Sequence, residues 1–167
     1  MAVKYDAESL LDTVLEIMTT GGALNAKIDA IEAEKISISK GLTPTLAQVA
    51  ATSYHLQTWT EKVLQSSPAI FYGIEDVKAE SNGSAVAKTY SIFVEVVMTD
   101  SGLSNDGSKR INRYARALEE LFAESFKPAI ASSMVKIDQV RPVAWKVALD
   151  SDDEIKVGGI SLTISLV

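Results

Sequence analysis

The sequence holds few side chains that could carry out catalysis. His55 is the single histidine among 167 residues and the only conventional general base, and there is no cysteine. A Ser-His-Asp arrangement would need Ser53 or another serine beside His55, and no GxSxG turn is present to hold such a serine. We therefore expect His55 to be a surface or half-buried residue, and we expect no enzymatic activity.

The residue types also argue against metal and cofactor sites. Without cysteine there are no thiolate zinc or iron–sulfur sites, and one histidine cannot supply two imidazole ligands. The acidic run 150–154 fails the calcium-loop pattern, because Ile155 stands where that loop needs glycine and Ser161 where it needs glutamate. No GxxxxGK(S/T) or GxGxxG phosphate loop occurs. Gly158 and Gly159 instead predict a bulge or a close approach of two backbones.

Composition favours a binding or structural role. The net charge is −6, so the chain as a whole is not expected to attract nucleic-acid phosphates. Hydrophobic residues make up 47% of the chain, which is average for a globular domain. No apolar run is long enough to span a membrane, and we expect no membrane partner.

One predicted helix, over residues 108–126, carries its charges in an unusual order. Apolar residues form a stripe along one side of it. The opposite side holds five charged residues, Lys109, Arg113, Arg116, Glu120 and Glu124. The cations come before the acids, which is unfavourable for the helix dipole and for ion pairs within the helix, by about a few tenths of a kcal/mol each. This side is predicted to be either a solvated surface or a contact surface for an acidic partner.

The polar loop that precedes this helix offers another source of negative charge. Asp100 and Asp106 lie at or near its two ends, and the loop, residues 100–107, also contains two glycines that let it adapt to a neighbour. We therefore treat Asp100 and Asp106, together with Lys109, Arg113 and Arg116, as candidate interface residues.

The chain, residues 1–167, is predicted to form a single domain in three parts. Residues 1–35 show helical spacing on both sides of a break at Gly21-Gly22. Residues 36–67 show no clear period, and we interpret them as an irregular segment that makes contacts. Its candidate interface residues are apolar side chains that have no evident place in a core, namely Tyr54, Leu56 and Trp59.

Residues 68–167 are predicted to form a β-β-α-β-β core. The elements are, in order, strands near 69–77 and 90–99, the helix over 108–126, and strands near 134–149 and 160–166. A slip in the apolar alternation beside Pro142 predicts a bulge or an edge position for the third strand. The expected fold is α+β, with a four-stranded, mainly antiparallel sheet, a long amphipathic helix packed on one face, and additional N-terminal helices.

Five sequence features follow one another within residues 67–167. They are the strand start Pro68-Ala69-Ile70-Phe71, the turn Asn82-Gly83, the alternating strand 90–96, the amphipathic helix 110–118, and the closing run from Gly158-Gly159 to Ile164. In this order they resemble the tail terminator, or tail completion, proteins of long-tailed bacteriophages.

The resemblance implies a ring, usually a hexamer, that terminates the tail tube and joins it to the head connector. The expected partners are further copies of the chain, the tail tube protein, the head–tail connector proteins, and genomic DNA that passes through the lumen without specific binding. The resemblance further implies a place in the virion after assembly in the host cytoplasm, and it implies no active site.

Two other functions remain open on the sequence. A head-completion or stopper protein of the same neck would also form a ring around DNA. A small-molecule-binding α+β module would instead need a deep pocket, for which residues 36–67 are the natural cover. The assembly state separates these classes, because a pure monomer with a closed apolar pocket would favour the second.

Overall fold

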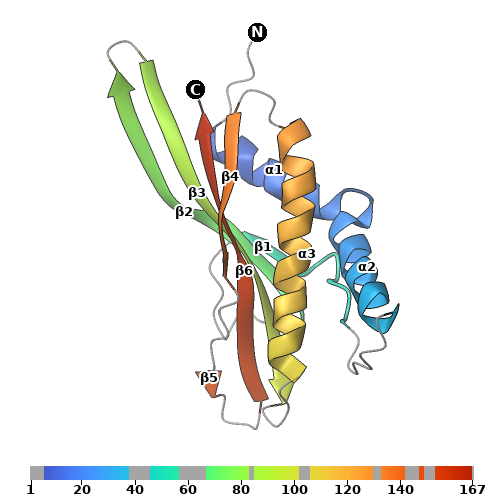
Figure 1. Ribbon diagram of the computed structural model, residues 1–167. Coiled ribbons are helices and arrows are strands. Elements are labelled where there is room, and N and C mark those ends of the chain that lie inside the picture. The colour runs from blue at the N-terminus through green and yellow to red at the C-terminus, as the bar shows by residue number, and fades with distance from the viewer. Residues whose placement is uncertain are drawn as a thin grey trace.

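The chain folds as an α+β structure, seen in the computed structural model of Figure 1. The structure describes residues 6–37, 46–56, 67–82, 85–101, 106–129, 133–141, 147–148 and 153–166. Within these ranges the chain gives helices first, then a hairpin, a long helix and further strands. The predicted α+β class is therefore confirmed.

Two helices open the described chain. Helix α1 (Ala7–Thr19) starts at Asp6, whose carboxylate accepts a hydrogen bond from the backbone N–H of Ser9 at 2.8 Å. The short 3-10 helix η1 (Thr20–Gly22) follows, and its two glycines have φ values of 62° and 71°, which glycine adopts without strain. Helix α2 (Ala23–Ser37) then leads away at an angle. The predicted break between two N-terminal helices is confirmed.

Six strands of the described chain form one sheet. They are β1 (Tyr54–Leu56), β2 (Ala69–Asn82), β3 (Ala85–Ser101), β4 (Ser133–Arg141), β5 (Val147–Ala148) and β6 (Asp153–Leu166). Their order across the sheet is β1-β2-β3-β6-β4, and β5 pairs with β6. Strand β6 therefore lies between β3 and β4, and it is antiparallel to both.

The sheet is mixed, which corrects the prediction of a four-stranded, mainly antiparallel sheet. Strand β1 runs parallel to β2, with Tyr54 opposite Ile70. With three residues β1 is too short to show an alternation, so periodicity could not reveal it. Within the predicted strand 134–149 the structure describes two strands, β4 and β5, and β4 is an edge strand, as the slip in its alternation predicted.

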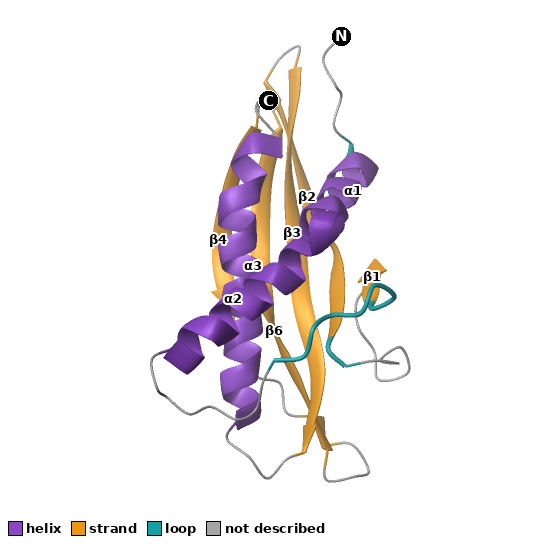
Figure 2. Cartoon of the chain, turned by 90° about the vertical axis from the view of Figure 1, so that its right-hand side faces the viewer, coloured by secondary structure: helices purple, strands orange, loops and turns teal. Residues whose placement is uncertain are grey.

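Helix α3 (Asp106–Ala129) is slightly longer than predicted at both ends and contacts elements on two sides. It contacts β6, β4 and β3 on one side and α1 and α2 on the other, and Figure 2 shows the helices together on one side of the sheet. Its buried apolar residues are Ile111, Tyr114, Ala115, Ala117, Leu118, Leu121 and Phe122. Most of them belong to a single apolar cluster with side chains of α1, α2, β2, β3 and β6.

The opposite face of the sheet also buries apolar side chains. A second cluster is formed by Ala69, Phe71, Val97, Ile155 and Val157, with Phe93 packed against it. Along β2 these residues alternate with members of the main cluster, as the two-residue period of a strand requires. The half of the sheet that holds the start of β2 and the start of β6 is therefore buried on both faces.

Gly158 and Gly159 bring three elements together in β6. A Cβ atom on Gly158 would lie 2.8 Å from Cγ1 of Ile111 on α3. A Cβ atom on Gly159 would overlap the carbonyl oxygen of Val94 and lie 2.8 Å from Cα of Glu95, both on β3. Because a side chain would push these neighbours away, only glycine lets α3 and β3 approach β6 so closely. The close approach predicted for this pair is confirmed.

We predict that Gly159→Ala lowers the free energy of unfolding by about 3 kcal/mol or more, because backbone atoms of β3 cannot turn aside as a side-chain end can. The matched control is Ser161→Ala in the same strand, at a partly exposed position, for which we expect a change below about 1 kcal/mol. Denaturant unfolding followed by circular dichroism measures both. Similar small losses in the two variants would contradict the tight β3–β6 approach.

Candidate assembly surfaces

Arg113 lies inside the structure and not on a solvated face. Its Nη1 donates a hydrogen bond to Oε1 of Glu32 on α2 at 2.6 Å, and the two side chains are only 7% and 11% exposed. A buried ion needs its partner, because an uncompensated charge in the interior is strongly destabilising. Arg113 therefore links α3 to α2, which corrects the expectation that it contacts a separate acidic partner.

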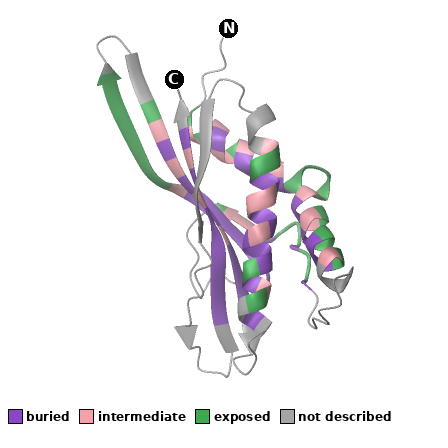
Figure 3. Cartoon of the chain, in the orientation of Figure 1, coloured by how far each residue is buried: buried purple, intermediate pink, exposed green. Residues whose placement is uncertain are grey.

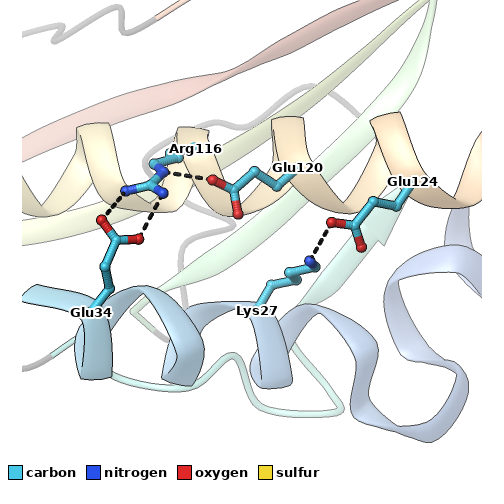
Figure 4. A network of polar contacts seen from close by, with 5 residues as sticks. All are labelled: Lys27, Glu34, Arg116, Glu120 and Glu124. Carbon is cyan, nitrogen blue, oxygen red and sulfur yellow. Dashed lines mark hydrogen bonds and ion pairs between the residues drawn. The ribbon is translucent and has the colours of Figure 1, made fainter.

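Arg116, one turn further along α3, is held by two carboxylates (Figure 4). Its Nη1 and Nη2 donate to the two oxygens of Glu34 on α2 at 3.2 and 2.8 Å, and its Nε donates to Glu120 at 2.6 Å. The hydrogen bonds to Glu34, and then the one to Glu120, raise the pKa of Arg116 above its ordinary value. This group is partly exposed, so solvent screens it far more than the Arg113–Glu32 pair.

Together these contacts form a seam between two antiparallel helices, which we call the α2–α3 charged seam. Its members are Lys27, Glu32, Glu34, Arg113, Arg116, Glu120 and Glu124. Lys27, near the start of α2, pairs with Glu124, near the end of α3, at 2.7 Å. Along the chain, each of the two helices carries its basic residues before its acidic ones. Because the helices run antiparallel, the basic end of each lies beside the acidic end of the other. Comparing the two helices in the sequence would have revealed this partner.

The other candidates near α3 lie elsewhere. Lys109 is exposed on the first turns of α3. Asp100 is placed in β3, opposite Glu154 of β6 in the backbone register, and Asp106 is the first residue of α3. The side chains of Asp100 and Asp106 are outside what the structure describes, as are residues 102–105. The carboxylates that hold Arg113 and Arg116 come from α2 and from α3 itself.

The irregular segment supplies one exposed apolar side chain among the predicted candidates. Leu56, in β1, is 57% exposed. Tyr54 in the same strand packs against the main apolar cluster, and burial raises its pKa. His55 is half-buried with its ring centroid 4.9 Å from that of Phe71. Trp59 lies outside the described residues.

Residues 46–50 are fastened to the helices by two polar side chains. The hydroxyl of Tyr114 on α3 donates a hydrogen bond to the carbonyl oxygen of Ala47 at 2.7 Å. The side-chain amide of Asn25 on α2 bonds both the N–H and the carbonyl of Val49, at 2.8 and 3.0 Å. These contacts let Leu46 and Val49 join the main cluster although they lie in no helix or strand.

The tip of the β2–β3 hairpin, residues 80–82 and 85–87, extends beyond the β3–β6 pairing, at the upper left of Figure 1. We call residues 75–82 of β2 the hairpin arm. Residues 75–81 are all exposed, although successive residues of a strand point to opposite faces, so both faces of this part of β2 are open (Figure 3). Val77 alone is 46% exposed. The sequence predicted the hairpin but not this exposure. Charged residues on both faces of the strand, such as Glu75 and Asp76, could have indicated it.

Among the described strands, the sheet has an open edge on each side. On one side, β1 covers β2 only at residues 70–72, so no strand lies beside residues 74–82. On the other side, β4 pairs with β6 and with no further strand of the described chain. Open edges present unpaired backbone N–H and C=O groups, which makes them templates for a strand of another molecule.

Two comparisons with known proteins gave no match. No protein-family model matches the chain, and no curated protein matches it. In the part of the chain that the structure describes, no three His, Asp or Glu side chains are grouped so that they could hold a metal ion. None of the helices described here is both long and apolar enough to cross a membrane.

We predict that Glu32→Gln lowers the free energy of unfolding by about 3–5 kcal/mol, because it leaves the buried Arg113 guanidinium without a charged partner. Glu124→Gln is the matched control. It removes a carboxylate from the exposed end of the same seam and should cost less than about 1 kcal/mol. Urea unfolding at pH 7 measures both changes. An equally small loss in both variants would show that burial adds nothing to the Arg113–Glu32 pair.

Tyr114 makes stability depend on alkaline pH. Burial, partly offset by the hydrogen bond to Ala47, raises the pKa of Tyr114 from 10.0 to about 12. The folded state therefore favours the neutral phenol, whose contribution is complete below pH 10 and is lost as pH rises through about 12.

We predict that Tyr114→Phe is less stable than the unmodified chain at pH 7, by about 0.5–1.5 kcal/mol, because it loses one hydrogen bond. Between pH 10 and pH 12 the unmodified chain should lose its advantage, since only it must keep the phenol of Tyr114 protonated. Unfolding curves measured at several pH values test this. A constant difference across that range would contradict the raised pKa.

Proposed function

We propose that this chain is a structural subunit that assembles with further copies into a ring, which terminates a phage tail tube and joins it to the head connector. The observation that carries the proposal is the sheet with an open edge on each side. The phage setting is supported by the resemblance of residues 67–167 to tail terminator proteins. Both supports point to a protein that works by assembly.

Two unlike edges favour a ring over a simple dimer. The residues of β2 and β4 differ, so a contact between them joins two different surfaces. Such head-to-tail contacts continue from copy to copy until the rotation closes, and a closed ring leaves no edge unpaired. In the assembled subunit α3 packs on one face of the sheet, because its apolar residues belong to the same cluster as β3 and β6.

The size and charge of the chain suit passage of DNA. A chain of 167 residues has a radius of gyration of about 15 Å, so six copies side by side enclose an opening wide enough for a duplex. The net charge of −6 suits a lumen that lets DNA pass without binding it. The proposed partners are the tail tube protein and the head–tail connector proteins, and the proposed place is the virion neck.

We predict that the purified chain forms rings of a single copy number, and that it binds one end of tail tubes from the phage that carries this sequence. Negative-stain imaging and native mass spectrometry detect the rings, and a gold-labelled chain marks the tube ends. His55→Ala is the control and should bind normally, since the proposal gives that residue no catalytic part. A chain that stays monomeric alone and with tubes, or that labels tube sides, would contradict the function.

A further inference from the structure

The two open edges of the sheet lie at the same level along the strands. In the backbone register, Val77 of β2 is opposite Tyr90, Tyr90 is opposite Ile164, and Ile164 is opposite Val135 of β4. A second row runs in the same way from Ile74 through Ile92 and Leu162 to Ile137. The free stretch of β2 and the first half of β4 are therefore level with each other across the sheet.

This placement suits a closed ring. A rotation about an axis parallel to the strands, with no translation along that axis, brings the β2 edge of one copy beside the β4 edge of the next. The tilt of the strands adds a stagger to this alignment. Three antiparallel pairings separate β2 from β4, so these two strands run in opposite directions. The new contact is then antiparallel and continues the pattern of the sheet.

The residue types at matching levels are complementary. The rows bring Ile74 level with Ile137, Val77 level with Val135, and Asp76 level with Lys136. Residues directly opposite each other in an antiparallel pair share a face, so apolar residues would meet apolar ones and an acid would meet a base.

The whole edges are complementary in charge as well. Residues 74–82 hold three acids and one lysine, a net charge of −2, whereas residues 133–141 hold two bases and one acid, a net charge of +1. Pairing two β2 edges would place −2 against −2, so charge favours the unlike pair and disfavours a symmetric one.

We propose that the occupant of the open β2 edge is a second copy of this chain, whose β4 pairs antiparallel with it and places Lys136 beside Asp76. The inference deepens the proposed function and rests on its claim that copies assemble. It adds which strands meet, in which direction and in which register.

Disulfide trapping tests the pairing directly. The chain has no cysteine, so Val77→Cys combined with Val135→Cys introduces the only two thiols. Within one chain these positions are three strand spacings apart, about 14 Å, which is too far for a disulfide. Mild oxidation should therefore give a ladder of covalent multimers on a non-reducing gel, ending at the ring. Either single variant should give dimers at most.

The matched control pairs Val77→Cys with Ser161→Cys, which lies in β6, an interior strand of the sheet. It should give no ladder beyond dimers. No ladder from the first pair, or an equal ladder from the control, would overturn the edge pairing. Native mass spectrometry before oxidation separates the two proposals. Rings without a ladder would overturn the pairing and leave the function standing, whereas a chain that stays monomeric both alone and with tail tubes would overturn both.

Charge exchange tests the register. Asp76→Lys places two lysines at the same level in every contact of the ring, so the concentration needed for half-assembly should rise about tenfold or more. Adding Lys136→Asp should bring that concentration back to within about twofold of the original. A double variant that assembles no better than Asp76→Lys alone would show that these two residues are not neighbours.

Discussion

The close packing of α3 against β6 is the constraint on which the rest of the described structure depends. Gly158 and Gly159 remove the side chains that would hold α3 and β3 away from that strand, so both come close to it. Ile111, which lies over Gly158, is only two residues from Arg113. The distance between helix and sheet therefore also fixes where the Arg113 guanidinium meets Glu32, and with it the place of the N-terminal helices.

Helix α3 is consequently held by different forces on its two sides. Burial of apolar side chains attaches it to the sheet. This interaction is non-directional, and its free energy is roughly proportional to the apolar area removed from water. The charged seam attaches it to α2 at defined points, since Lys27 and Glu34 each meet a partner of opposite sign only when the helices run antiparallel. Desolvation offsets most of the attraction in the buried Arg113–Glu32 pair, so removing one partner costs more than the intact pair adds to stability.

Local pattern sufficed wherever an element is regular and its burial follows from its own residues. The break at Gly21-Gly22, the long helix and the strictly alternating strand from Ile160 could be predicted in this way. The short β1 has too few residues for a period, and Arg113 and Glu32 are separated by 81 residues, so no local rule connects them. The exposure of the hairpin arm depends on where the neighbouring strands end, which is a property of the whole sheet.

The position of β6 has a consequence for biosynthesis. It follows every other described element in the sequence, yet it is the strand that joins β4 to β3. While a ribosome adds about 5–20 residues per second, β4 leaves the exit tunnel with no strand to pair with until β6 emerges. A polypeptide released early would lack the link that sets one outer edge level with the other. In the proposed ring, translation would have to pass through β6 before a subunit could offer both edges to its neighbours, and incomplete products would be kept out of the assembly.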